Sequence, residues 1–174
     1  MERLILLDVN GVLCFKDPTK SINTSVNCGN YHVVMRPNIL NFLKMLNQQF
    51  TVGIFSSTTY VNLEKILNFV DLKWKRYIHI VADRSTAALD PDFGINDKIT
   101  NYVTVKNLSQ FWSHPVHNKD RKWNQGNTLL VEHDPMKVRF NDPSNIMIID
   151  EFKSLEEKET LKDVYVRILG KMKQ

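Results

Sequence analysis

Side chains that can act as nucleophiles, acids or anion binders follow apolar runs at several places in this sequence. Because such runs predict buried strands, the polar residues after them are expected at strand ends. They are Asp8 and Asn10 after residues 4–7, Ser56 after residues 50–55, Lys106 on a later connection, and Glu132 and Asp134 after residues 128–131. The carboxyl ends of parallel strands form the edge at which α/β proteins bind ligands, so this order predicts one shared pocket.

An acid, a hydroxyl, a lysine and a second acid suit phosphoryl transfer. A carboxylate such as Asp8 can attack phosphorus and form an aspartyl-phosphate, which divides one difficult displacement into two easier ones. Two carboxylate positions can hold Mg²⁺, which reduces the repulsion between an anionic nucleophile and an anionic substrate. The Ser56 hydroxyl and the Lys106 ammonium can bind the transferring group. Taken singly, Asp8 could instead cap a turn, and the hydroxyl cluster at Ser56 could cap a helix.

The elements that would position these residues alternate between strand and helix. Strands are predicted at residues 4–7, 50–55, 77–81, 128–131 and 145–149, and helices from Arg36-Pro37, over residues 60–70, and after a capping box at Ser154-x-x-Glu157. Residues 16–31 and 83–105 are expected to form loops or short hairpins. Parallel strands need crossover connections, so the pattern predicts an α/β fold with a Rossmann-like parallel sheet, helices on both faces and no large cap domain.

The composition indicates one globular domain over residues 1–174, with 43% hydrophobic and 24% charged residues. The net charge of +4 is small, and the basic loop 119–123 contains one aromatic residue, which disfavours nucleic acid as the partner. No window reaches the roughly 18 apolar residues of a membrane span, so no membrane partner is expected. Cys14 and Cys28 are expected to be reduced thiols, which predicts an intracellular, cytoplasmic or nuclear protein. No pattern in the sequence predicts an oligomeric state.

The order of the motifs resembles the haloacid-dehalogenase superfamily, in particular its branch of polymerase C-terminal-domain and NLI-interacting-factor-like phosphatases. The matching stretches are DVNGVL at 8–13, MRP at 35–37 followed by Phe42-Leu43, IFSS at 54–57, VKNLS at 105–109 and TLLVEHDP at 128–135. They resemble the family's D-x-D-x-[TV]-[LV], RP…FL, second-motif, VKDLS and TLLVDDSP patterns. The likeness covers almost the whole chain and implies a haloacid-dehalogenase-like fold.

The resemblance also implies a role for each matching residue. Asp8 would be the nucleophile, and Ser56 and Lys106 would bind the phosphoryl group. Mg²⁺ would lie between the Asp8 carboxylate, the Asn10 main-chain carbonyl and the first acid of the fourth motif, which is Glu132.

A second alignment gives the metal a different acid. If the strand continues past its last apolar residue, Glu132 and Asp134 point to the same side, and Asp134 becomes the alternative metal ligand. Pro135 favours the alignment that uses Glu132.

The sequence departs from the family pattern in two motifs. Asn10 stands where the family has its general acid and base, and an amide cannot transfer that proton, a function worth about 10²–10⁴-fold in rate. In the fourth motif Glu132 is one methylene longer than aspartate, His133 replaces an aspartate, and Asp134 replaces a small hydroxyl residue.

Two functions follow from this pattern. The first is a Mg²⁺-dependent phosphatase of weakened activity that forms an aspartyl-phosphate and acts on phosphoserine or phosphothreonine in a phosphorylated protein or peptide. The second is an inactive pseudophosphatase whose pocket binds phosphorylated or acidic partners. Asp8, Ser56 and Lys106 favour the first, whereas Asn10 and His133 favour the second.

Overall fold

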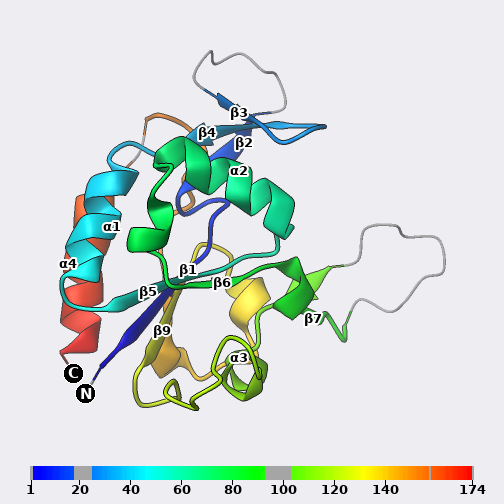
Figure 1. Ribbon diagram of the computed structural model, residues 1–174, viewed down its shortest axis with the longest axis vertical. Helices are drawn as coiled ribbons and strands as arrows, with labels where there is room; N and C mark the ends of the chain where they lie inside the picture. The colour runs from blue at the N-terminus through cyan, green and yellow to red at the C-terminus, as the bar shows by residue number, and fades with distance from the viewer. Residues whose placement is uncertain (1, 18–24, 93–102, 157, 174) are drawn as a thin grey trace.

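The computed structural model describes residues 2–17, 25–92, 103–156 and 158–173, and its centre is a five-stranded parallel sheet (Figure 1). The strands are β1 (Leu4–Leu7), β5 (Thr51–Phe55), β6 (Ile80–Ala82), β9 (Thr128–Glu132) and β10 (Ile146–Ile148), in the order β10-β9-β1-β5-β6. The predicted parallel sheet is therefore confirmed, although the third strand begins three residues later than the pattern suggests. Every residue of β1 is buried, as expected for a central strand covered on both faces.

The strand register brings the predicted site residues to one edge. Leu7 in β1 lies opposite Ile54 in β5 and Val131 in β9. One residue further along, Asp8 lies beside Glu132, and Ser56 follows β5 at the same edge. Because β1 has β5 on one side and β9 on the other, this edge is the point at which the strand order reverses, where α/β sheets bind ligands.

Helices cover both faces of the sheet. The larger core packs α1 (Ile39–Asn47), α2 (Tyr60–Val70) and α4 (Leu161–Met172) against one face. The smaller core on the other face contains α3 (Leu108–Ser113), Trp123 and Val138. Alternation of side chains along β1 divides them between the two cores, with Ile5 and Leu7 facing the first and Leu4 and Leu6 the second.

Two small antiparallel sheets stand outside the main sheet. After β1 the chain forms β2 (Cys14–Asp17), β3 (Ser25–Asn27) and β4 (His32–Met35), in the order β2-β4-β3. Later, β7 (Ala88–Leu89) pairs with β8 (Thr104–Val105), which leads directly into Lys106. Both regions were predicted as loops or hairpins. Residues 18–24 and 93–102, which fall inside these two predictions, lie outside the described residues.

Two helices begin later than the sequence pattern predicts. Helix α1 begins at Ile39, because Asn38 adopts a left-handed conformation with φ of 66°. Helix α4 begins at Leu161, so the capping box predicted at residue 154 is wrong. The Ser154 hydroxyl donates to the Glu156 carbonyl, and Glu157 lies outside the described residues.

The real capping box is formed by Thr160 and Asp163. The Thr160 side chain accepts from the Asp163 N–H, and the Asp163 carboxylate accepts from the Thr160 N–H. The buried positions of α4 begin immediately after Thr160, at Leu161, and continue with Val164 and Ile168. The cap therefore lies where the apolar stripe begins.

The basic loop at residues 119–123, which follows α3, lies away from the edge that carries Asp8. A surface hollow is lined by Lys119 and Lys122 of this loop together with Glu2 and Thr51, at the amino ends of β1 and β5. Lys122 forms an ion pair with Glu2. The loop therefore borders the end of the sheet opposite the edge that carries Asp8.

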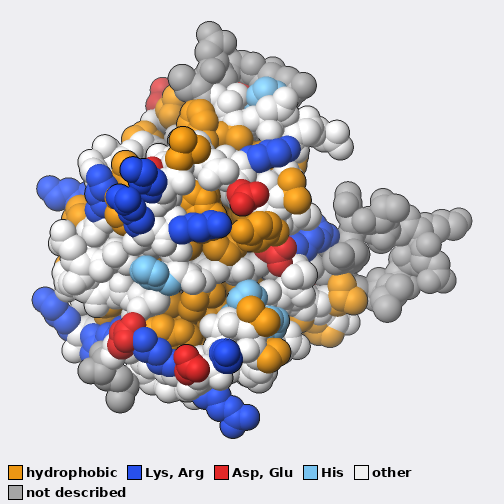
Figure 2. Space-filling model, in the orientation of Figure 1, with side chains coloured by type: hydrophobic (Ala, Val, Ile, Leu, Met, Phe, Trp, Pro, Cys, Tyr) orange, Lys and Arg blue, Asp and Glu red, His pale blue; other side chains and the backbone are white. Residues whose placement is uncertain are grey.

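None of the helices in the described part of the chain is both long and apolar enough to cross a membrane. On the face shown in Figure 2, lysine and arginine side chains are interspersed with acidic, histidine and apolar side chains.

Candidate active site

Three charged side chains form the buried centre of the site. Asp8 follows β1, Glu132 ends β9, and Lys106 enters from the segment after β8. The Lys106 Nζ lies 2.7 Å from Asp8 Oδ1 and also forms an ion pair with Glu132 Oε2. The side chains of Asp8, Lys106 and Glu132 are 2%, 0% and 0% exposed. One ammonium thus holds two carboxylates in a water-poor environment, as expected for buried charges.

Backbone contacts fix the position of Lys106. Its N–H donates to the Lys137 carbonyl at 2.7 Å, and its carbonyl accepts from the Asn141 side-chain amide at 2.7 Å. The Asn141 side-chain oxygen also accepts from the Leu108 N–H. This anchoring explains how a lysine outside the main sheet reaches a carboxylate at the end of β1.

The charges of the site determine the protonation of Asp8 and Lys106. Burial alone would raise the pKa of Asp8, but the Lys106 charge and the nearby His133 ring hold that pKa well below its ordinary range. Burial alone would lower the pKa of Lys106, but Asp8 and Glu132 raise it. Asp8 is therefore an anion and Lys106 a cation at neutral pH.

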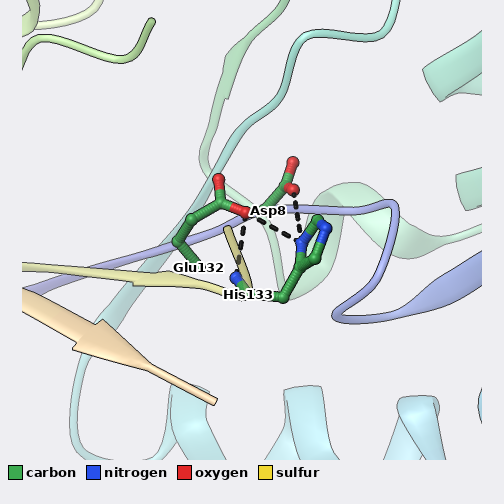
Figure 3. Close-up of side chains that lie close together, drawn as sticks. All are labelled: Asp8, Glu132 and His133. Carbon is green, nitrogen blue, oxygen red and sulfur yellow. Dashed lines mark hydrogen bonds and ion pairs between the residues drawn. The ribbon is translucent and has the colours of Figure 1, made fainter. Parts of the chain in front are cut away.

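His133 places a ring nitrogen between the two carboxylates (Figure 3). Its Nδ1 lies 2.9 Å from Glu132 Oε1 and 3.6 Å from Asp8 Oδ2. Its Nε2 lies 3.9 Å from Glu151 Oε1. Burial would lower the pKa of His133, but contacts with Asp8 and Glu132 raise it to about 9. Each carboxylate thus directs one oxygen toward Lys106 and the other toward this ring.

Gly11 makes room for the His133 ring. A Cβ atom at residue 11 would lie 2.5 Å from His133 Nδ1, which is shorter than any tolerated contact. Gly11 also has a φ of 80°, a left-handed conformation that favours glycine. The sequence indicated the turn at Gly11, whereas its packing against His133 appears only in the folded chain.

Two oxygen atoms, Asp8 Oδ2 and Asn10 Oδ1, are buried without a hydrogen-bond partner, and among the described residues Asn145 Oδ1 is a further such oxygen. His133 Nδ1 also lacks a well-aligned hydrogen bond, but it lies 2.9 Å from Glu132 Oε1 and, with its raised pKa, carries a proton at neutral pH. One ligand atom from each of Asp8, Glu132 and His133 lies within 4.8 Å of the other two. Buried acceptors without donors are costly, and a cation satisfies them. The site therefore fits a divalent metal ion.

The two acids proposed as alternative metal ligands differ in their contacts. Glu132 Oε1 accepts from the N–H groups of His133 and Asp134, while Oε2 pairs with Lys106. Both Glu132 oxygens are thus engaged, although Glu132 remains close enough to contact an ion. Asp134 is the N-cap of the short helix η3 (Pro135–Val138) and accepts from the Met136 N–H. It is not part of a metal-binding group among the described residues.

Ser56 lies at the same edge of the sheet as Asp8 and is 1% exposed. Its N–H donates to the Ala82 carbonyl, and its hydroxyl oxygen accepts from the Thr58 N–H at 3.2 Å. Its proposed role in phosphate binding remains a prediction.

Sequence comparison identifies the family of this chain. A model of the NLI interacting factor-like phosphatase family matches residues 3–174. The chain belongs to this family. A relative from Schizosaccharomyces pombe, described as an uncharacterized FCP1 homology domain-containing protein, is 25% identical over 172 residues. That match covers 94% of this chain and 66% of the relative, so the chain spans about two thirds of the relative's length.

Solved structures show the same fold. The structure of Fcp1, described as an essential RNA polymerase II CTD phosphatase, has a TM-score of 0.58 and 12% identity, covering 87% of this chain and 42% of that one. A fission yeast Fcp1 variant bound to beryllium fluoride has a TM-score of 0.59 and 10% identity, and the match covers 99% of this chain and 51% of that one. An uncharacterized protein from Listeria monocytogenes serotype 4b has a TM-score of 0.56 and 11% identity, and the match covers 99% of each chain. The haloacid-dehalogenase-like fold expected from the motifs is confirmed.

Within this phosphatase family, the sequence pattern marks His133 only as a departure from the fourth motif, and the contact of its ring with the two acids appears only in the folded chain. His133 comes directly after Glu132, and adjacent residues in a regular strand point to opposite faces. The sequence pattern therefore argues against a contact between these two side chains. The chain bends after Glu132, and the ring returns to the same carboxylate.

Proposed function

We propose that the protein is a divalent-cation-dependent phosphatase that uses Asp8 as its nucleophile, with Mg²⁺ as the cation that the family implies. One observation carries this proposal. Asp8 is held as an anion with Oδ1 paired to Lys106, while Oδ2 has no hydrogen-bond partner. An oriented carboxylate anion of this kind is what an attack on phosphorus requires.

The proposed reaction has two displacements. A carboxylate oxygen of Asp8 forms a bond to phosphorus while the bond from phosphorus to the substrate hydroxyl oxygen breaks, and the leaving oxygen takes a proton. Water then attacks the phosphorus of the aspartyl-phosphate, which restores the Asp8 carboxylate and releases inorganic phosphate. Lys106 keeps the carboxylate oriented in both steps, and the Ser56 hydroxyl would donate to a phosphoryl oxygen.

A cation would be held by Asp8 Oδ2 and the acceptor atoms beside it. When bound, it would offset the repulsion between the Asp8 anion and the phosphate. Mg²⁺ needs only one or two carboxylates because it keeps several waters, so the oxygens of Asp8 and Asn10 suffice for it.

We propose phosphoserine or phosphothreonine in a protein or peptide as the substrate. In the described part of the chain, the insertions beside the site form only the small sheets β2-β4-β3 and β7-β8, and neither is a separate cap domain. A site without a large cap suits a phosphorylated side chain on a larger molecule better than it suits a small metabolite.

Asn10 supports a second candidate, the pseudophosphatase. The Asn10 amide cannot protonate the leaving oxygen, and the Asp8 side chain is 2% exposed, with the His133 Nδ1 3.6 Å from its Oδ2. A site with these properties could bind a phosphorylated or acidic partner without turnover. In the phosphatase reading, the leaving oxygen takes its proton from water, and the rate is correspondingly low.

Phosphate release from a phosphopeptide with added Mg²⁺ tests these candidates. The wild-type protein should release phosphate slowly, and Asp8→Asn should abolish the release. Asn10→Asp should raise turnover by up to about 10²–10⁴-fold, the usual contribution of general acid and base catalysis. Because Asn10-Gly11 can deamidate, the intact mass of each preparation must be verified. No turnover from either the wild type or Asn10→Asp would contradict the phosphatase and favour the binding module.

A further inference from the structure

We propose that His133 is a metal ligand through Nδ1, and that it makes this site select a borderline transition-metal ion, such as Zn²⁺ or Co²⁺, over Mg²⁺. The inference rests on the proposed function for the presence of a cation beside Asp8. The sequence departs from the family pattern at His133, and this departure would change which metal ion the site prefers.

The spacing of the acceptor atoms is that of ligands around one ion. Metal–nitrogen and metal–oxygen bonds of roughly 2.1 Å place two ligand atoms about 3.0 Å apart at a right angle and about 3.4 Å apart at the tetrahedral angle. His133 Nδ1 lies 3.6 Å from Asp8 Oδ2 and 2.9 Å from Glu132 Oε1. An ion can therefore contact Asp8 Oδ2 and His133 Nδ1 together with small adjustments.

Two oxygens lack partners, because Asp8 Oδ2 and Asn10 Oδ1 are buried without a hydrogen bond. His133 Nδ1 faces Glu132 Oε1 at 2.9 Å and Asp8 Oδ2 at 3.6 Å, so an ion bound among these residues would take the place of the proton on Nδ1. Both Glu132 oxygens are already engaged by Lys106 and by backbone N–H groups. We assign Glu132 to holding Lys106 and adding negative charge, and we assign Asp8 and His133 to direct metal contact.

The surroundings of the His133 ring suit a ligand. Histidines that bind metals usually direct their second ring nitrogen toward a carboxylate, which fixes the orientation of the ring. His133 Nε2 lies 3.9 Å from the Glu151 carboxylate, on the side of the ring away from Asp8. The ring also packs directly against Gly11, where no side chain competes for the space.

An imidazole changes the metal preference of an otherwise oxygen-rich site. Mg²⁺ takes oxygen ligands and gives up its waters reluctantly. Imidazole nitrogen suits zinc, copper, iron and nickel, and affinity for mixed nitrogen and oxygen sites rises from manganese toward copper. A carboxylate with an imidazole therefore favours Zn²⁺ or Co²⁺, whereas two oxygens alone would leave Mg²⁺ competitive.

Calorimetric titration of the metal-free full chain with Co²⁺ and with Mg²⁺ tests this preference. We expect Co²⁺ to bind at least tenfold more tightly than Mg²⁺. His133→Asn should weaken Co²⁺ binding by about 10–100-fold or more, since loss of even an outer-shell partner costs that much. Mg²⁺ binding should stay within about twofold. The matched control is His79→Asn, because His79 is exposed and lines the hollow at the opposite end of the sheet.

Nitrogen NMR of the histidine rings in the wild-type protein gives a readout that does not depend on a variant folding. Zn²⁺ should shift one ring Nδ1 resonance, and that resonance should be missing from His133→Asn. Binding of Zn²⁺ without any shift of a ring nitrogen, or equal metal preference in the wild type and His133→Asn, would overturn the inference.

The outcomes separate this inference from the proposed function. Phosphate release that depends on Asp8, combined with the same metal preference in the wild type and in His133→Asn, would contradict the inference and leave the phosphatase intact. Metal binding through His133 without any phosphate release would support the inference and contradict the phosphatase.

Discussion

At the scale of single residues, Lys106 is the cation that two buried carboxylates share. It pairs with both Asp8 and Glu132 and is itself completely buried. Removing one partner of a buried ion pair leaves an uncompensated charge, which costs more than the pair itself contributes. The same side chain therefore stabilises the fold and orients the proposed nucleophile.

Lys106→Met should lower the free energy of unfolding by about 3–5 kcal/mol at neutral pH, since it leaves two carboxylates buried without their cation. Urea unfolding followed by circular dichroism measures this change. Lys119→Met is the matched control, because Lys119 is exposed, and it should change stability by no more than about 0.5 kcal/mol. A loss below about 1 kcal/mol for Lys106→Met would show that the buried charges are not coupled as described.

The sequence was sufficient to place some residues of the site and insufficient for others. Asp8, Ser56 and Glu132 each follow an apolar run, and the register of parallel strands brings such positions together without further information. The contact between His133 and Asp8 depends on the bend after β9 and on the missing side chain at Gly11. Local sequence patterns do not show that the His133 ring folds back across the bend after β9 to contact Asp8.

At the scale of elements, the central strands were predictable, and the helix starts were less so. The apolar runs at residues 4–7 in β1 and 129–131 in β9 indicate strands that are buried on both faces. For α4, two hydroxyl residues each precede an acid by three positions, at Ser154 and at Thr160. Packing decides between them, because Leu161 is the first residue of α4 buried against the core.

A pair of alanine variants tests where α4 begins. Thr160→Ala should lower the free energy of unfolding by about 1 kcal/mol, the usual cost of losing an N-cap side chain. Ser154→Ala should leave it nearly unchanged, because Ser154 bonds only to the Glu156 carbonyl among the described contacts. Thermal unfolding of both variants provides the comparison. A larger effect at Ser154 than at Thr160 would contradict the helix start seen here.

At the scale of the whole molecule, binding at this edge should stabilise the entire fold. The site joins residues from β1, β9 and the segment after β8, so an ion bound there connects parts of the chain that are far apart in sequence. An ion that binds the folded state alone raises stability by mass action.

Addition of a divalent cation should therefore raise the melting temperature. At a concentration a hundredfold above Kd, the gain is about 2.7 kcal/mol, or roughly 5–10 °C for a domain of this size. Asp8→Asn should lose most of this increase relative to its own metal-free melting temperature. Differential scanning calorimetry with and without Mg²⁺ or Co²⁺ makes the comparison. An equal increase in Asp8→Asn would place the bound ion elsewhere.

The central claim is that Asp8 carries the phosphoryl group during turnover, and trapping that intermediate tests it most directly. The protein is mixed with a phosphopeptide and cation, denatured rapidly in acid, and treated with borohydride, which reduces an acyl phosphate to an alcohol. Peptide mass spectrometry then locates the reduced residue. The account predicts that residue 8 is converted to homoserine in wild-type and Asn10→Asp proteins. Phosphate release with no modification at residue 8, or with modification at another acid, would contradict it.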